Sequence, residues 1–133
     1  MSNVFNKSVQ LGSASTGTFS AASSGDTKNG TSINMNDVED GTLSAYLVAT
    51  IATGSVTITP RWRVSKNNST FYTIKDQNNV AKTAISATET VVLEAPKAVA
   101  GWPYSRLSLV VGGSTGTTGD TYDIRYSYRN RVA

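Results

Sequence analysis

The chain has 133 residues, a formal net charge of +3 with 16% charged residues, and neither cysteine nor histidine. Without thiols or imidazoles, disulfides, thiolate metal sites and histidine-dependent nucleophilic triads are excluded. No apolar stretch approaches the roughly 20 residues of a membrane helix, and residues 1–10 lack the apolar run of a signal peptide. We therefore expect a single domain that is made in a cytoplasm and contacts no membrane.

The first 30 residues differ in composition from the rest of the chain. Residues 8–25 carry no charge and consist mainly of Ser, Gly, Ala and Thr. Two interpretations stay open for residues 1–30: the first strands with a loop between them, or an extended arm that docks on a neighbouring subunit. The anchors of such an arm would be the apolar side chains spread through it, which are Val4, Phe5, Val9, Leu11 and Phe19. Residues 31–133 are expected to form a β-sandwich domain.

The middle of the chain alternates with the period of a β-strand. From Val56 to Val64 the even positions are apolar or proline, and the odd positions are threonine and arginine. This pattern predicts a half-buried strand whose inner face includes Trp62. Pro60 cannot donate a backbone hydrogen bond, so it indicates a sheet edge or a bulge. A similar alternation predicts a strand from Leu43 to Ile51.

Further strands follow at short intervals. The pattern predicts a hairpin over residues 64–74 with its turn at 66–69, short strands at 81–85 and 88–94, and a last hairpin formed by 106–111 and 120–131. In the final strand Tyr122, Ile124, Tyr126 and Tyr128 share one face. Short strands at this spacing, without a long helix, predict an all-β fold. We expect a single-domain antiparallel β-sandwich, jelly-roll-like, with eight or nine strands and an N-terminal extended arm.

No segment carries the pattern of a catalytic, cofactor or metal site. The glycine-rich stretch 112–121 lacks the Gly-Lys-Ser/Thr ending of a phosphate loop. The acidic stretch 34–41 does not fit a calcium loop, because aligning Gly41 with the loop glycine puts Val38 and Leu47 where ligands are required. The nine acidic residues are dispersed. The sequence therefore predicts a protein without enzymatic activity, cofactor or metal.

The arginines favour a solvated face or a protein interface. Arg61 and Arg63 share the outer face of one strand, and Arg125, Arg129 and Arg131 share the outer face of the last strand. If those strands lie near each other, they form one basic patch that could contact phosphates or an acidic protein partner. A single-strand binder also presents aromatic side chains beside its cations. Here the aromatic side chains have the opposite parity, so nucleic acid is not the expected partner.

Three stretches resemble a known class of protein. They are Trp62-Arg63-Val64-Ser65 with the following turn and Phe71-Tyr72, then Trp102-Pro103-Tyr104-Ser105-Arg106-Leu107, and finally the segment from Gly113 to Arg129. Together they resemble small structural proteins of tailed-phage virions. The resemblance implies a head decoration, or cement, protein: a sandwich that binds the major capsid protein on the outer surface of the virion and stabilises the shell, with a homotrimer as the favoured assembly.

Other functions stay open. The hairpin with its serine, turn and aromatic pair is also similar to hairpins of carbohydrate-binding sandwiches. A carbohydrate- or receptor-binding module of a head fibre or tail would display exposed aromatic side chains, and the candidates are Tyr46, Tyr72, Trp102 and Tyr104. A major coat subunit and a neck or tail component are compatible with the same composition.

Overall fold

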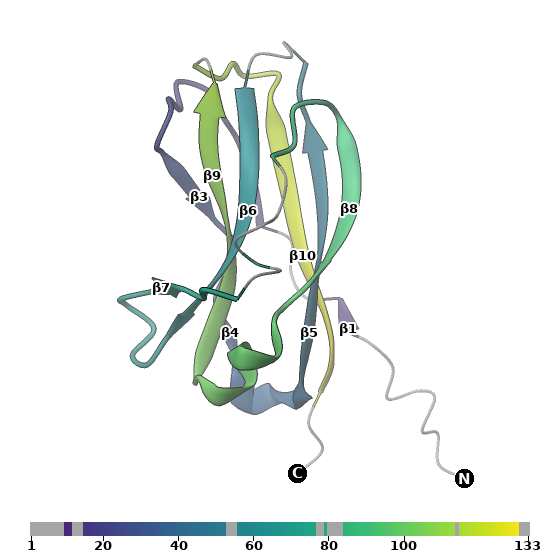
Figure 1. Ribbon diagram of the computed structural model, residues 1–133. Helices are drawn as coiled ribbons and strands as arrows, with labels where there is room; N and C mark the ends of the chain where they lie inside the picture. Colours follow the sequence, from purple (N-terminus) through teal and green to yellow (C-terminus); the bar gives the residue numbers. More distant parts are fainter. Residues whose placement is uncertain are drawn as a thin grey trace, which may run out of the picture.

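The computed structural model describes residues 10–11, 15–52, 56–76, 79, 84–113 and 115–130, and these form a sandwich of two antiparallel sheets (Figure 1). Sheet one contains β1 (Gln10–Leu11), β2 (Ser15–Thr18), β10 (Thr121–Asn130), β5 (Val38–Thr50) and β8 (Glu89–Glu94). Sheet two contains β3 (Thr27–Asn29), β4 (Ile33–Asn34), β9 (Tyr104–Gly113), β6 (Val56–Ser65) and β7 (Tyr72–Thr73). Two short 3-10 helices are η2 (Met35–Asp37) and η3 (Lys97–Gly101). The predicted all-β sandwich is confirmed.

The strand pairing is nested from the ends of the chain inward. β1 and β2 both pair with β10, β3 and β4 both pair with β9, β5 pairs with β8, and β6 pairs with β7. Each of these two pairs, β1 with β2 and β3 with β4, therefore acts as one interrupted edge strand. The ten described strands occupy eight positions, four in each sheet. A long hairpin folded over into two four-stranded sheets has this order, and it is the arrangement of a jelly roll.

The core lies between the sheets and follows the alternation along the strands. Trp62 in β6 and Tyr126 in β10 are both 0% exposed, and their ring centroids are 6.1 Å apart. Tyr122 and Tyr128 are half-buried and pack against the same core. The prediction that Trp62 and the tyrosine row face inward is confirmed, because each strand sends alternate side chains to opposite faces.

Pro60 lies where one side of β6 has no continuous neighbour. On that side Ile58 exchanges two backbone hydrogen bonds with Ile85, at 3.0 and 2.7 Å. Two residues beyond Pro60, the Trp62 N–H donates to the side-chain oxygen of Asn79 at 2.8 Å, and β7 pairs with β6 only from Arg63 onward. Because proline has no N–H, it stands between these partners without leaving an unsatisfied donor. The sequence predicted a sheet edge or a bulge here; β6 lies between β9 and β7 in sheet two, but it lacks a strand partner at Pro60 itself.

The predicted last hairpin is wrong. β9 pairs with β6 in sheet two and β10 pairs with β5 in sheet one, so the connection between them crosses from one sheet to the other. Asp120 holds this crossing at the start of β10. Its carboxylate is buried and accepts hydrogen bonds from the N–H groups of Ala52 at 2.8 Å and Thr117 at 2.9 Å.

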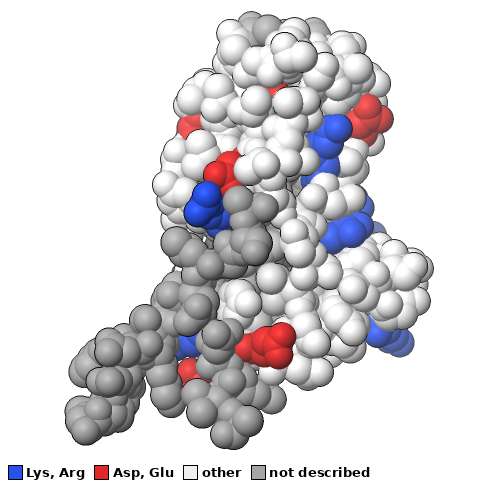
Figure 2. Space-filling model, turned by 180° about the vertical axis from the view of Figure 1, so that it is seen from behind, with Lys and Arg blue, Asp and Glu red and all other residues white. Residues whose placement is uncertain are grey.

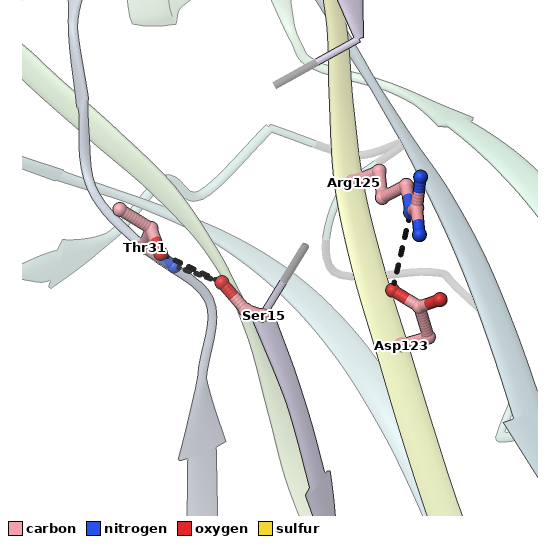
Figure 3. Close-up of polar contacts among 4 residues, drawn as sticks. All are labelled: Ser15, Thr31, Asp123 and Arg125. Carbon is pink, nitrogen blue, oxygen red and sulfur yellow. Dashed lines mark hydrogen bonds and ion pairs between the residues drawn. The ribbon is translucent and has the colours of Figure 1, made fainter. Parts of the chain in front are cut away.

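A polar contact joins the two sheets beside their first edge strands. The hydroxyl of Ser15, in β2, lies 2.7 Å from the hydroxyl of Thr31 and accepts a hydrogen bond from the Thr31 N–H at 2.9 Å (Figure 3). Thr31 lies between β3 and β4, so the contact links sheet one to sheet two. The described residues before position 30 thus belong to the sandwich itself.

Candidate functional site

Two features are absent from the described residues. Among these residues no group of three or more carboxylate, imidazole or thiol side chains is placed to hold a metal ion. In the same part of the chain, no helix has the length and apolar character needed to cross a membrane. The described strands build three exposed surfaces of interest: the arginines of β6, the outer face of sheet one, and the β6–β7 turn.

The five residues expected to anchor an N-terminal arm do not lie together on one exposed segment. Val4, Phe5 and Val9 lie outside the described residues. Leu11 pairs with Ser127 as the last residue of β1. Phe19 is 0% exposed in the core, and its ring centroid lies 5.1 Å from that of Tyr122. Phe19 is therefore corrected from an arm anchor to a core residue, because its side chain is already enclosed within this molecule.

The arginines do not form the single basic patch that would result from neighbouring strands. Arg61 and Arg63 lie on β6 in sheet two, whereas Arg125 and Arg129 lie on β10 in sheet one. The outer faces of the two sheets point away from each other, so the patch is divided. Arg131 lies outside the described residues. In Figure 2, which shows the molecule from behind, blue groups recur down the right-hand side.

Arg63 has a cationic neighbour that the sequence prediction did not include. Arg106 of β9 is its direct cross-strand partner. The Arg106 guanidinium lies 3.8 Å from the centroid of the Phe71 ring, and burial, followed by the charge of Arg63, lowers the pKa of Arg106. Like charges directly opposite each other disfavour strand pairing, so stacking on Phe71 offsets part of this cost. The outward parity of Arg106 was the signal that could have identified it.

The outer face of sheet one carries the docking face, which we define as Tyr46, Val92 and Arg125. Tyr46 of β5 is the cross-strand partner of Val92 in β8 and of Arg125 in β10, so the three side chains form one row across three strands. Tyr46 is 41% exposed and Val92 is 65% exposed. The row combines an aromatic, an aliphatic and a cationic side chain on a rigid sheet.

Arg125 keeps much of its surface in solvent. Its Nε lies 3.6 Å from a carboxylate oxygen of Asp123, two residues earlier on the same face of β10 (Figure 3). This separation is an ion pair but is longer than a hydrogen bond. The Arg125 side chain remains 46% exposed, so the ion pair orients the guanidinium and leaves its donors available.

A third surface lies at the β6–β7 turn, which stands out from the sandwich in Figure 1. The aromatic groove, of about 330 Å³, is lined by Lys66, Asn67, Thr70, Tyr72 and Trp102. The rings of Tyr72 and Trp102 have centroids 6.3 Å apart and are tilted by 45°. Thus two of the four aromatic residues predicted for a sugar site lie together.

The other two aromatic candidates lie elsewhere. Tyr46 belongs to the docking face on sheet one. Tyr104 is half-buried in β9, where it is the cross-strand partner of Ser65. Nothing in the sequence showed that Tyr72 and Trp102 meet. They are 30 positions apart in the chain and come together because β6 pairs both with β7, which contains Tyr72, and with β9, which follows Trp102.

No protein-family model and no curated protein match this chain. Two solved structures show a distant likeness in fold. A structure described as "Bacillus endospore appendages form a novel family of disulfide-linked pili" has a TM-score of 0.46 at 12% identity, over 92% of this chain and 88% of that one. The Clostridium thermocellum xylanase 10B CBM22-1–GH10 structure with xylohexaose has a TM-score of 0.33 at 10% identity, over 96% of this chain but only 27% of that one. Neither likeness identifies what this chain does.

Proposed function

We propose that this chain is a non-enzymatic structural protein of a virion, a capsid decoration subunit that binds the outer surface of the shell through the docking face. The observation that carries the proposal is Val92, an aliphatic side chain 65% exposed on an open edge strand. Folded proteins usually protect such edges with charge or cover. An exposed apolar side chain beside unpaired strand groups is suited to a protein partner.

The surroundings of Val92 favour docking by a chain segment or loop of the partner. β8 pairs with β5 on one side only, and a hollow of about 690 Å³ lies beside the end of β8 and the residues that follow it, lined by residues 92–97 and by Asp76. An extended segment can add to such an edge through backbone hydrogen bonds, while pockets beside the strand select its side chains. Tyr46 and Arg125 continue this surface across the sheet, and both residue types are enriched at protein interfaces.

Decoration requires shape and repetition. The proposed partner is the major capsid protein, and the proposed assembly on its surface is a homotrimer of this chain. A standard protein interface buries about 1,200–2,000 Å² in total. A subunit that contacts several neighbours in a shell binds more tightly than each contact alone would allow, because later contacts form within one complex. A stiff sandwich meets this need without any reactive group.

The test is co-sedimentation of the purified chain with shells assembled from the proposed partner, the major capsid protein. The wild type is expected to saturate the shells at a fixed copy number. Val92→Glu places a charge on the docking face, and we expect it to weaken binding at least about tenfold, which corresponds to about 1.4 kcal/mol. Tyr72→Ala, on the other sheet, is the matched control and should bind like the wild type.

A second variant examines the N-terminal residues. Deleting residues 1–9 removes Val4, Phe5 and Val9 and leaves every described strand intact. If these residues form a docking arm, the shortened chain stays folded and loses affinity for the shells. Failure of the wild type to sediment with shells, or undiminished binding by Val92→Glu, would contradict the proposed docking face.

A further inference from the structure

The two aromatic rings of the aromatic groove, those of Trp102 and Tyr72, differ in how far they are buried. Trp102 is half-buried and packs against the core, and its backbone N–H donates to the carbonyl of Val99 at 3.1 Å. Tyr72 is 55% exposed and lies in a strand of only two residues. The groove thus has one fixed indole ring and one exposed phenol ring. A ligand can contact both rings without displacing core side chains.

The turn that forms the polar wall is held in place before any ligand arrives. The side-chain oxygen of Asn67 accepts hydrogen bonds from the N–H groups of Ser69 at 2.9 Å and Thr70 at 3.0 Å. The hydroxyl of Ser32 donates to the side-chain oxygen of Asn68 at 2.5 Å, which ties the turn to a distant segment. A pre-ordered wall lowers the entropic cost of binding.

Several donors that line the groove have no hydrogen-bond partner among the described residues. Backbone N–H groups occupy the oxygen of the Asn67 amide, and its NH₂ group remains a donor. Within the described part of the chain, the Asn67 NH₂, the Thr70 hydroxyl, the Tyr72 hydroxyl and the Lys66 ammonium make no hydrogen bond. The Lys66 Nζ lies 5.8 Å from the Trp102 ring centroid, at the edge of cation–π distance. Among the described residues that line the groove, Lys66 is the one with a charged side chain.

We propose that the aromatic groove binds a pyranose sugar that carries a carboxylate or another anionic substituent. One face of a pyranose ring is lined by C–H groups and suits an aromatic ring, while its rim of hydroxyls requires hydrogen-bond partners. Lys66 supplies the charge that selects an anionic sugar. The volume of about 330 Å³ is near the lower limit for small-molecule sites, which suits one or a few sugar residues.

The groove is distinct from the docking face, since none of the described residues that line the groove belongs to the docking face or lines the hollow beside Val92. A particle-bound subunit can therefore present the groove outward while the other sheet contacts the shell. The inference does not depend on shell binding, because the groove is formed within one copy of the chain. Each site has variants that leave the other unchanged.

The experiment compares a trimer of galacturonic acid with a trimer of galactose, using calorimetry and tryptophan emission. Since Trp62 is 0% exposed, a ligand-induced change in emission reports on Trp102. We expect the acidic trimer to bind the wild type more tightly than the neutral one and to lose affinity as salt rises. Tyr72→Ala should weaken binding about tenfold, and Lys66→Gln should remove the preference for the acidic sugar.

Two controls isolate the site. Tyr46→Ala removes an exposed tyrosine from the other sheet and should leave sugar binding unchanged, and Val92→Glu should also bind sugar normally while failing on shells. Circular dichroism checks that each variant is folded. Absence of binding by the acidic trimer, equal affinity for both trimers, or unchanged binding by Tyr72→Ala would each overturn the proposal.

Discussion

At the scale of single residues, Asn79 replaces a stretch of missing strand. It is fully buried, its side-chain oxygen accepts from the Trp62 N–H at 2.8 Å, and its NH₂ group donates to the carbonyls of Trp62 at 3.1 Å and Ile74 at 2.7 Å. One amide side chain therefore satisfies the backbone of β6 where β7 does not reach. Buried backbone groups require such partners, because leaving them unpaired costs free energy.

Asn79→Ala is expected to lower the free energy of unfolding by about 2–4 kcal/mol, since it leaves the Trp62 N–H and the Ile74 carbonyl without partners, while the Trp62 carbonyl keeps only the Ile74 N–H at 3.2 Å. Chemical denaturation measures this value. The matched control is Asn67→Ala. Asn67 also accepts several hydrogen bonds, but it is exposed, so water replaces them and the loss should stay below about 1 kcal/mol. Equal losses for the two variants would contradict the role of burial.

Residue-level prediction from the sequence succeeded for side chains whose position depends on parity alone. Trp62 and Tyr126 are in the core because their strands alternate. Asn79 and Asp120 could not be recognised, because a buried polar side chain is defined by backbone groups that come from distant parts of the chain. The meeting of Tyr72 with Trp102 depends on tertiary packing in the same way.

At the scale of elements, β5 contains an irregularity that brings it against η3. Asp40 and Gly41 have positive φ values of 59° and 67°, and the register between β5 and β10 shifts over this part of the strand. A Cβ added at Gly41 would overlap the Cβ of Ala100 in η3. Only glycine combines this backbone conformation with so close a neighbour.

Gly41→Ala should destabilise the fold by about 2–4 kcal/mol, through backbone strain and overlap together. Gly25→Ala separates the two causes. Gly25 has a φ of 96°, yet a Cβ there would meet nothing within 4 Å, so this variant carries only the strain. Thermal unfolding of both variants measures the difference, and a Gly41→Ala protein no less stable than Gly25→Ala would argue against the contact with Ala100.

Alternation predicted where strands lie but not which strands become neighbours. The glycine-rich segment between β9 and β10 matches the composition of a hairpin tip, and the strands on either side alternate as hairpin strands do. In the fold, β9 pairs with β6 and β10 pairs with β5. A polar turn-forming segment suits either a hairpin or a crossing between sheets, so composition could not distinguish them.

At the scale of the whole molecule, the buried Tyr126 and the half-buried Tyr122 make the free energy of unfolding depend on pH in the alkaline range. Burial raises the pKa of Tyr126 above its ordinary value, although the hydrogen bond from the Leu107 N–H to its hydroxyl, at 2.9 Å, acts in the opposite direction. Burial also raises the pKa of Tyr122. In the folded state these phenols hold their protons at a pH where the unfolded chain releases them, near pH 10.

Because the unfolded state binds fewer protons above about pH 10, the free energy of unfolding should fall there, by up to about 1.4 kcal/mol per pH unit for Tyr126. The full contribution is present below about pH 10 and is lost as the pH rises toward the folded pKa. Melting temperatures from pH 8 to 11 measure the decline. Tyr126→Phe should flatten it while lowering stability at neutral pH, because the Leu107 N–H loses its acceptor. A wild-type melting temperature that stays constant up to pH 11 would refute this linkage.

The nested pairing also governs when the protein can complete its fold during synthesis. β10 is the common neighbour of β1, β2 and β5, yet it follows all three in the chain and so leaves the ribosome after them. A nascent chain that ends before β10 therefore holds β5 with an open side and an uncovered apolar face. Ribosomal stalling before β10 would release chains prone to aggregate, and a tag placed after β10 reports only on chains that have already made their closing strand.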